Sequence, residues 1–472
     1  MKNLRRKTWL CIFLVSALCL GAWYYFLRPE DMVLPGMDQQ SSKTPTLILW
    51  YTDESLTDYL NSASVAYQDA EGVRVEPVLK TGLEYIEEIY DASVKNEEMP
   101  DLYITGTDTL EKAALAGLAQ PIKDPENVLN SFNYPEIAMN AVTYDGQRVA
   151  YPFYYETAFL LYNSTYLSQM ADAELRSEPL EGEEEDEEGA GHTYVPDAGI
   201  PEGYTEESWK EAVAQRTQEL IPTSIEDITR LAMEHGAPEG MENFFVWDVS
   251  DIYYNYFFAG AYMNVGGDCG DDPDQIDICN PDSIHCMSTY QSLHQFFSID
   301  SKESSYEKVL QDFLDGKTLF AIVTTDAIPT VEKAYEDGEY RYGYGVAALP
   351  GVDAEHVAKG LSATSCVAVN AFSEYTDEAN LFAEYIMYES ADTLYDRTGK
   401  LPCMGGVQEE SAGARDVVRQ IYQESAVLPK LMTLSNFWVE LELAYSRVWD
   451  GAEPEQTLKD LSEQMQQQME KF

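Results

Sequence analysis

Three short apolar runs near the start of the folded region decide the fold: TLILWY at residues 46–51, VRVEPVL at residues 73–79 and LYIT at residues 102–105. Each run precedes a segment whose apolar residues recur at helical spacing, around residues 56–67, 86–90 and 110–118. Strands that alternate with helices predict a parallel sheet, and ligands usually bind outside the carboxyl ends of such strands. The sequence therefore predicts an α/β fold.

The rest of the chain continues this mixed pattern. Residues 145–163, DGQRVAYPFYYETAFLLYN, predict two extended runs on either side of Pro152. Residues 253–262, YYNYFFAGAY, predict an aromatic-rich helix, and residues 309–325 predict a helix, a glycine turn and a strand. Extended segments are expected at 340–350 and 366–370, and helices in the remainder. No internal repeat is visible, so the number of domains has to be estimated from the length of the chain.

Composition and charge bound the function. The 472 residues include 83 Asp and Glu against 30 Lys and Arg, a formal net charge of -53, and this excludes a nucleic-acid partner, which needs cationic surface. Because 45% of the residues are hydrophobic, with 33 Tyr and 17 Phe, most of the chain must fold. Single cores stop growing at roughly 250–300 residues, so two domains or lobes are expected.

The N-terminus predicts a segment that enters a membrane. Lys2, Arg5, Arg6 and Lys7 precede an uncharged run from Thr8 to Leu27, long enough to span a bilayer with its N-terminus in the cytoplasm. Bulky residues stand where a signal peptidase needs small ones, which favours a retained anchor at 1–27 over a cleaved signal peptide. The polar residues 28–43 predict a linker. The folded part is then expected on the outer face of the cell membrane.

One acidic stretch interrupts the folded region. Residues 181–188, EGEEEDEE, hold seven acidic residues in eight positions. A block of like charge repels itself and stays solvated, so a flexible surface insertion is predicted at about 176–203.

Three cysteines lie close together in the sequence, at Cys269, Cys279 and Cys286. An exported location permits a disulfide, and Cys269 with Cys279 would close a hairpin-like loop, although the sequence leaves the pairing open. A metal site is the alternative, because His285 lies beside Cys286. The spacing fits no zinc pattern, so no metal is predicted and a structural disulfide is preferred.

The common catalytic motifs are absent from the sequence: HExxH, GxSxG, a Walker loop and a dinucleotide fingerprint. No cofactor is expected. A glycoside hydrolase needs only two carboxylates, so this activity stays open as an alternative.

Several segments, taken in order, resemble the extracellular solute-binding proteins of ABC importers in the maltose-binding class. LILWY, the helix after it and EGVRVEPV are similar to the family's opening strand, helix and strand. MPDLYITGTDTLEKAALAGLAQPI and DGQRVAYPFYYETAFLLYN follow and resemble the next segments of the family. Further similar segments are IPTSIEDITRLA, FLDGKTLFAIVTTD, YGVAALPG, TGKLPCMGGV and the C-terminal run that contains SNFW. The resemblance covers about residues 46–470 apart from the insertion.

This resemblance implies a two-lobe, periplasmic-binding-protein-like (type II) α/β fold that closes on its ligand by hinge motion. The N-lobe would comprise 44–152 and 346–389, and the C-lobe 153–345 and 390–472. It also implies a monomer that is not an enzyme. Such a protein captures a sugar or oligosaccharide and delivers it to ABC permease subunits.

The resemblance also carries over individual residues. Asp108 and Glu156 match sugar-binding carboxylates, Trp438 matches a stacking tryptophan, Asp53 and Glu54 follow the first strand where the family uses polar groups, and Tyr254 is an approximate match. Simpler roles exist for three of them, since Asp108 could cap a helix, Glu156 could pair with a buried arginine and Trp438 could belong to the core.

Two departures from the family pattern put maltodextrin itself in doubt. The segment TTDAIP replaces a stretch that often holds a tryptophan, and Thr105 stands where maltodextrin binders have an aromatic residue. Another oligosaccharide, a peptide and a polyamine therefore stay open as ligands. Two alternative functions stay open besides import: an exported glycoside hydrolase, and a membrane-anchored sugar sensor or scaffold.

Overall fold

A computed structural model describes residues 45–177, 194, 199–297, 299–405, 413–431 and 436–469. The chain divides into two compact units, Met1–Pro45 and Thr46–Phe472. The predicted anchor at 1–27 and linker at 28–43 lie outside the described residues, and so does most of the acidic insertion. No helix in the described part is long and apolar enough to cross a membrane.

The predicted parallel sheet is present at the start of the second unit. Strands β1 (Thr46–Tyr51), β2 (Arg74–Leu79) and β3 (Leu102–Gly106) pair in parallel in the order β2-β1-β3. Helices α2 (Thr57–Glu71), α3 (Tyr85–Lys95) and α4 (Leu110–Leu115) follow the three strands. Leu60 and Ile89 are fully buried on these helices, so the helical spacing in the sequence identified the faces that pack on the sheet.

Two long strands extend this sheet into the second half of the unit. β12 (Leu361–Val369) runs antiparallel to β3, and β6 (Tyr151–Asn163) runs antiparallel to β12. The far end of β6 pairs with β10 (Thr318–Thr324), which is parallel to β7 (Asn243–Val246). The sheet order is therefore β2-β1-β3-β12-β6-β10-β7, with β11 (Tyr344–Ala347) and β13 (Leu401–Pro402) also on β6 and β14 (Ala426–Val427) on β12.

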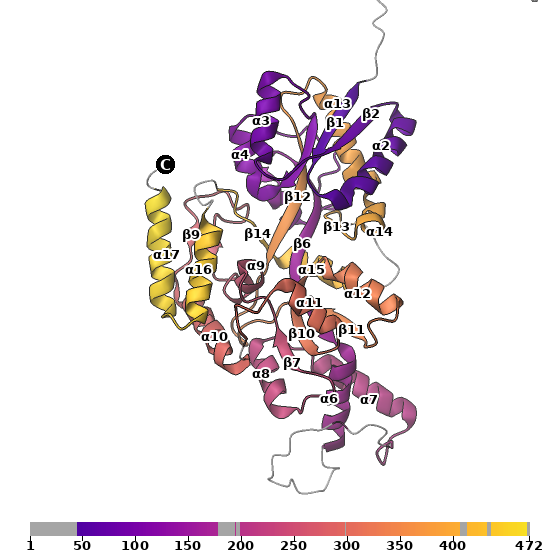
Figure 1. Cartoon of the computed structure of the whole chain (residues 1–472), viewed down its shortest axis with the longest axis vertical. Coiled ribbons are helices and arrows are strands. Elements are labelled where there is room, and N and C mark those ends of the chain that lie inside the picture. The colour runs from indigo at the N-terminus through magenta and orange to yellow at the C-terminus, as the bar shows by residue number, and fades with distance from the viewer. Residues whose placement is uncertain are drawn as a thin grey trace, which may run out of the picture. The chain divides into compact units, whose positions relative to one another are not determined.

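Figure 1 shows β6 and β12 running between two groups of elements. The upper group holds β1, β2, α2, α3 and α4 together with α13 (Thr376–Glu384) and α14 (Leu394–Thr398). The lower group contains α6 (Ser164–Ser177), α7 (Glu206–Glu219), α8 (Ile225–Glu234), α9 (Ile252–Asn255), α10 (Pro281–Phe297), α11 (Tyr306–Leu314) and α12 (Ala327–Glu336). The helices α16 (Phe437–Trp449) and α17 (Pro454–Met469) pack beside α10.

The shorter elements complete the unit. They are α5 (Glu136–Ala141), α15 (Ala414–Glu424), the strands β4 (Thr143–Tyr144), β5 (Gln147–Arg148), β8 (Asn264–Val265) and β9 (Ile276–Asp277), the single turns η1 (Glu54–Leu56), η2 (Thr107–Thr109), η3 (Tyr256–Phe258) and η5 (Ala391–Thr393), and the π-helical turn η4 (Tyr385–Glu389).

Local sequence signals explain several element ends. Ser224 begins α8 with a capping box, because its hydroxyl accepts from the Asp227 backbone N–H and the Asp227 carboxylate accepts from the Ser224 N–H. Gly316 has φ +73° between α11 and β10, and a Cβ there would lie 2.2 Å from the Tyr342 ring, so both backbone and packing require glycine.

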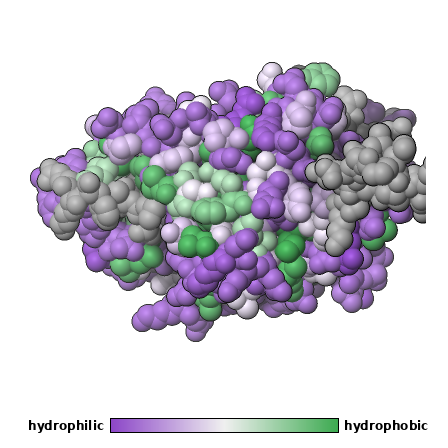
Figure 2. Space-filling view, turned by 90° about the horizontal axis from the view of Figure 1, so that it is seen from above, coloured by the Kyte–Doolittle hydropathy of each residue, from purple (hydrophilic) through white to green (hydrophobic). Residues whose placement is uncertain are grey.

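The core is largely aromatic and divides into clusters. One gathers β6, β10 and the helices of the lower group around Trp247 and Trp449, whose rings meet edge to face with centroids 5.7 Å apart. A second runs along the sheet and includes Tyr155, stacked on Tyr422 at 3.8 Å. A third fills the face of the first sheet around Trp50. In contrast, the face in Figure 2 is mostly hydrophilic, as the acidic composition requires.

Two sequence predictions need correction. Pro152 does not separate two extended runs but lies inside the single strand β6. It fits there because the β6–β12 pairing is irregular between Ser365 and Cys366, which oppose Tyr154 and Pro152. The aromatic segment 253–262 is not one helix either, since α9 ends at Asn255, η3 ends at Phe258 and turns follow. A Cβ on Gly260 would lie 2.3 Å from the Lys359 carbonyl oxygen, so the close approach of the two backbones requires glycine at this position.

The predicted disulfide is also wrong in this structure, where Cys269 and Cys279 are free cysteines. The hairpin of β8 and β9 pairs Asn264 with Asp277, so Cys279 lies beyond the paired residues while Cys269 lies in the connecting turn. The Cys269 carbonyl accepts from the Lys430 ammonium, which fixes this turn on a different neighbour. The two thiols therefore belong to different surroundings although ten positions separate them in the sequence.

Candidate functional site

The sheet topology brings several predicted residues to one edge. Asp53 follows β1 and Asp108 follows β3, and the carboxyl ends of these parallel strands lie at the same edge of the sheet. Glu156 lies on β6, where it opposes Ala363 of β12, and Ser365 of β12 opposes Gly106 at the end of β3. This edge, at the junction between the two groups of elements, is the candidate site.

A lysine connects two of the predicted carboxylates. Lys400 Nζ lies 2.7 Å from Asp53 Oδ2 and 3.8 Å from Glu156 Oε1. It lies 4.6 Å from the centre of the Tyr154 ring, and the Tyr154 hydroxyl donates to Asp53 Oδ2 at 3.4 Å. Lys400 reaches this position because the next residue, Leu401, opposes Tyr155 of β6 in the β13–β6 pairing. We call Asp53, Tyr154, Glu156 and Lys400 the carboxylate cluster.

The two carboxyl groups of the cluster differ in their electrostatics. Partial burial favours the neutral form of Asp53, but the hydrogen bonds from Lys400 and Ser55 outweigh it and lower the pKa of Asp53. For Glu156, burial dominates and raises the pKa, with Asp326 and Asp53 acting in the same direction and Lys400 against it. Asp53 is therefore the more firmly ionised of the two.

An aromatic pair lies at Asp326, a carboxylate that interacts electrostatically with Glu156. Tyr254 stacks on Tyr306 with ring centres 5.1 Å apart and planes at 14°. The Tyr306 hydroxyl donates to Asp326 Oδ1 at 2.8 Å, and the Thr324 hydroxyl bonds to the same carboxylate. Asp326 also raises the pKa of Glu156, which ties this aromatic pair to the carboxylate cluster. A negative field and ring faces thus meet in one region.

The other predicted residues lie outside these direct contacts. Asp108 is exposed at the end of β3, although the surrounding protein raises its pKa through desolvation. Glu54 is exposed in η1. Trp438 is half-buried at the start of α16, and its ring meets Tyr256 at 5.9 Å, so it packs against the same aromatic segment that carries Tyr254. The structure thus brings Asp53 and Glu156 together on Lys400 and links Tyr254 to them through Asp326.

Sequence reasoning missed four residues of this region. Lys400 and Asp326 lie in segments quoted for the family resemblance, TGKLPCMGGV and FLDGKTLFAIVTTD, but nothing in those segments marked either residue as part of a site. Tyr154 and Tyr306 were hidden among 33 tyrosines. For Tyr154 a signal existed, because residues 154 and 156 share one face of a strand.

A separate cavity of about 410 Å³ opens where α5, the aromatic segment and β14 meet. It is lined by Tyr256, Tyr262, Lys359, Glu136 and Gln423 among others, and it contains none of the six predicted residues. We place the candidate site at the carboxylate cluster because convergent ionisable groups and stacked rings gather there. Tyr256, which contacts Trp438, links the two regions.

The fold identifies the class of protein. The chain has the two-lobe α/β architecture of type II binding proteins, as comparison with solved structures shows. A cyclo/maltodextrin-binding protein complexed with maltotetraose superposes with a TM-score of 0.68 at 19% identity, over 90% of this chain and 97% of that one. An extracellular solute-binding protein from Staphylococcus aureus in complex with maltose gives a TM-score of 0.68 at 16% identity, over 90% and 98% of the two chains.

A third structure has the same fold. The GacH receptor of Streptomyces glaucescens, solved unliganded and in complex with acarbose, gives a TM-score of 0.64 at 15% identity, over 90% of this chain and 99% of that one. A family model described as bacterial extracellular solute-binding protein matches residues 62–419. The chain therefore belongs to the bacterial extracellular solute-binding proteins, which confirms the expected family and fold and implies an extracellular or periplasmic location.

Proposed function

We propose that this chain is the solute-binding component of an ABC-type carbohydrate importer, which captures a sugar or oligosaccharide at the carboxylate cluster and delivers it to permease subunits. The observation that carries the proposal is the convergence of Asp53 and Glu156 on Lys400, with the stacked rings of Tyr254 and Tyr306 connected to Glu156 through Asp326. Sugars offer hydroxyl donors and apolar ring faces, which carboxylates and aromatic rings complement. Solved proteins of the same fold hold maltotetraose and maltose.

We also propose that the two groups of elements move toward each other when solute binds. β6 and β12 connect the two groups, and the site has residues from both, because Asp53 belongs to one group and Asp326 to the other. A solute bound between them would favour closure around these strands, as hinge-closing binding proteins do. The lobe boundaries predicted above, with 44–152 and 346–389 in one lobe, belong to this proposal, and so do the roles of Asp108, Glu54 and Trp438. Retention at the membrane by residues 1–27 is also part of it.

The opposite pKa shifts of Asp53 and Glu156 suit a second function. A glycoside hydrolase uses one ionised carboxylate and one that holds its proton to a higher pH, and this pair is shifted in those directions. The two functions differ in what happens to the sugar, because a binder returns it intact.

The test is a thermal-shift screen of the full-length chain against mono- and oligosaccharides, followed by analysis of the mixture for breakdown products. A ligand of the folded state at a hundredfold excess over its Kd stabilises the protein by about 2.7 kcal/mol, which such a screen detects. A shift with intact sugar supports import, and sugar breakdown supports the hydrolase. No shift with any sugar would refute a carbohydrate ligand.

The Glu156→Gln variant tests the site itself. It keeps the shape of the side chain but removes the charge, and a hydrogen bond to a charged group contributes about 1.5–3 kcal/mol. We therefore expect the Kd for the sugar to rise by about tenfold or more. The matched control is Glu207→Gln on the exposed side of α7, which should leave the Kd unchanged. Equal effects of the two variants would remove Glu156 from the site.

A further inference from the structure

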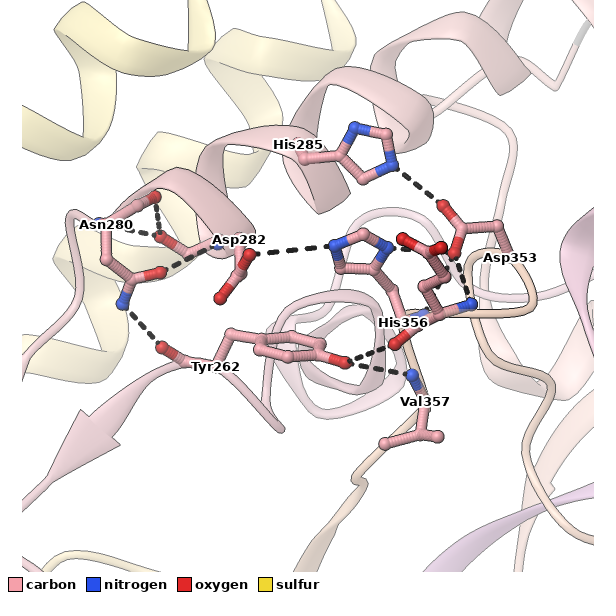
Figure 3. A network of polar contacts seen from close by, with 9 residues as sticks. Tyr262, Asn280, Asp282, His285, Asp353, His356 and Val357 are labelled. Atoms are coloured by element: carbon pink, nitrogen blue, oxygen red, sulfur yellow. Dashed lines mark hydrogen bonds and ion pairs between the residues drawn. The ribbon is translucent and has the colours of Figure 1, made fainter.

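Two of the five histidines in the sequence meet on the surface of the lower group. His285 lies on α10, and His356 lies in the loop that precedes β12. Their rings are 4.4 Å apart between centroids and inclined by 32°. Figure 3 shows both rings turned toward Asp353, which lies three residues before His356. This contact joins positions that are 71 residues apart in the chain, so no local motif predicts it.

Asp353 bridges the two rings. Its Oδ2 lies 2.8 Å from His285 Nε2, and its Oδ1 lies 2.8 Å from His356 Nδ1. The loop holds the carboxylate in place, because the backbone N–H groups of Glu355 and His356 donate to Oδ1 at 2.8 and 2.9 Å. One nitrogen or oxygen from each of the three side chains lies within 4.8 Å of the other two.

A fourth side chain faces the opposite edge of one ring. His356 Nε2, the nitrogen that points away from Asp353, lies 3.7 Å from Asp282 Oδ1. Asp282 lies in the first turn of α10, one turn before His285. A histidine that binds a metal through one nitrogen usually donates its other N–H to a carboxylate, a backbone carbonyl or water, which fixes the ring and increases its basicity. Asp282 is placed for that role.

We propose that His285 Nε2, His356 Nδ1 and the Asp353 carboxylate bind a divalent transition metal ion of the Zn²⁺ class, with water completing the coordination. Two imidazoles and one carboxylate suit this class, whereas Ca²⁺ and Mg²⁺ prefer oxygen ligands alone. Nothing in the proposed transport function requires this ion, so the inference is independent of it.

The distances are compatible with an ion of this size. Metal bonds of about 2.0–2.1 Å in a tetrahedron place neighbouring ligand atoms about 3.3 Å apart. The two nitrogen–oxygen separations are 2.8 Å, and the largest separation in the trio stays within 4.8 Å, so modest ring rotations create the geometry. The nitrogens that face Asp353 must give up their protons, and His356 keeps a proton on Nε2, toward Asp282.

The ion would act as a clamp in the lower group. It would attach α10 to the loop at 351–358, which Tyr262 also holds, since its hydroxyl donates to the Glu355 carbonyl at 3.2 Å and accepts from the Val357 N–H at 3.1 Å. The ligands come from two elements far apart in the sequence, so binding is expected to stabilise the folded state.

The test is titration of the chelator-treated full-length chain with Zn²⁺ by calorimetry, and with Co²⁺ by visible absorption. We expect one high-affinity ion per chain and a rise in melting temperature that chelator reverses. His285→Ala and His356→Ala should each raise the Kd for Zn²⁺ by at least 100-fold. Asp282→Asn, which leaves all three ligands in place, should raise it by about 10–100-fold.

The control is His294→Ala, which removes an exposed histidine from the same helix but outside the trio. It should leave the Kd for Zn²⁺ unchanged. The inference is overturned if the wild type binds no Zn²⁺, or if His285→Ala and His356→Ala bind it as tightly as His294→Ala does. Circular dichroism of the metal-free variants separates lost folding from lost ligands, and Asp282→Asn provides the test if an alanine variant fails to fold.

Discussion

Lys400 neutralises part of the carboxylate cluster, and its replacement by methionine gives the sharpest test of that cluster. Methionine keeps much of the side-chain stem over the Tyr154 ring and removes only the charge. At 2.7 Å the attraction between Lys400 and Asp53 is about 1.5 kcal/mol even with the dielectric constant of water. The Lys400 side chain is only 16% exposed, so screening is weaker than at an open surface. We expect Lys400→Met to reduce the free energy of unfolding by about 1.5–3 kcal/mol.

A double-mutant cycle isolates the pair. Asp53→Asn and Lys400→Met, alone and together, are compared by reversible urea unfolding of the full-length chain, and a coupling energy of about 1–2 kcal/mol is expected. The same cycle with Glu156→Gln should give less, because the 3.8 Å separation and the 45% exposure of Glu156 weaken the attraction. A coupling within about 0.5 kcal/mol of zero for Asp53, or a larger coupling for Glu156, would refute the reasoning.

The pH dependence gives the cycle an independent check. The pKa of Asp53 is lowered in the folded state, so its stabilising contribution is complete above its unfolded pKa of about 3.9 and is lost as the pH falls through the folded value. In Lys400→Met this acid-linked loss should shrink, because the hydrogen bond and charge that lower the pKa are gone. An unchanged acid profile would contradict the assignment.

Three further predictions concern the fold. Burial raises the pKa of Glu384 to about 8, so its contribution to stability is present below the unfolded pKa of about 4.3 and is lost as the pH rises toward 8. Glu384→Gln should therefore flatten the fall of the melting temperature with pH over this range, and an unchanged fall would contradict the burial. Gly316→Ala should lower the free energy of unfolding in urea by about 1–3 kcal/mol more than Gly338→Ala does, because both glycines have positive φ but only a side chain at 316 would clash with the Tyr342 ring. Equal losses for the two variants would exclude the clash. Replacing Cys269 and Cys279 by serine should leave the melting temperature nearly unchanged without reductant, whereas loss of a native disulfide would cost about 2–5 kcal/mol.

The elements that the sequence predicted well depend on local patterns. β1 occupies residues 46–51 as predicted, and α2 buries Tyr59, Leu60, Ala63 and Tyr67, the apolar positions that recur at helical spacing. Burial on one face imposes such a period whatever the rest of the chain does. The parallel order of β1, β2 and β3 followed from the alternation of strands and helices.

The predictions that failed depend on distant contacts. Pro152 would normally end a strand, but an irregularity in β12, more than 200 residues later, accommodates it within β6. The helix expected at 253–262 ends in the short turn η3 at Phe258, and Gly260 then packs closely against the Lys359 carbonyl from a distant part of the chain. Neither partner leaves a trace in the segment itself, so local propensity gave the wrong result.

The residues of the candidate site also divide into those that the sequence predicted and those that depend on distant contacts. Asp53 could be predicted because it follows a recognisable strand where the resembled family uses polar residues, and Glu156 because it matches a carboxylate position of that family. Lys400 could not, because its place depends on the register of the short strand β13 against β6. The pair of His285 and His356 was likewise invisible, and the sequence directed attention to Cys286, which is fully buried in the core.

The charges of the site restrict which solutes it can accept. Asp53 and Glu156 face a single lysine, and Asp326 adds a third carboxylate whose field raises the pKa of Glu156. The region therefore stays negative even with Lys400 in place, and the chain as a whole carries a net charge of -53. An anionic solute such as a sugar phosphate would meet like charge at the site and on approach, which costs affinity and slows association. Hydroxyl groups, in contrast, can donate to these oxygens without bringing charge of their own. The electrostatics thus disfavour an anionic solute and leave neutral, hydroxyl-rich solutes and cationic solutes as candidates, independently of the likeness to maltodextrin-binding proteins.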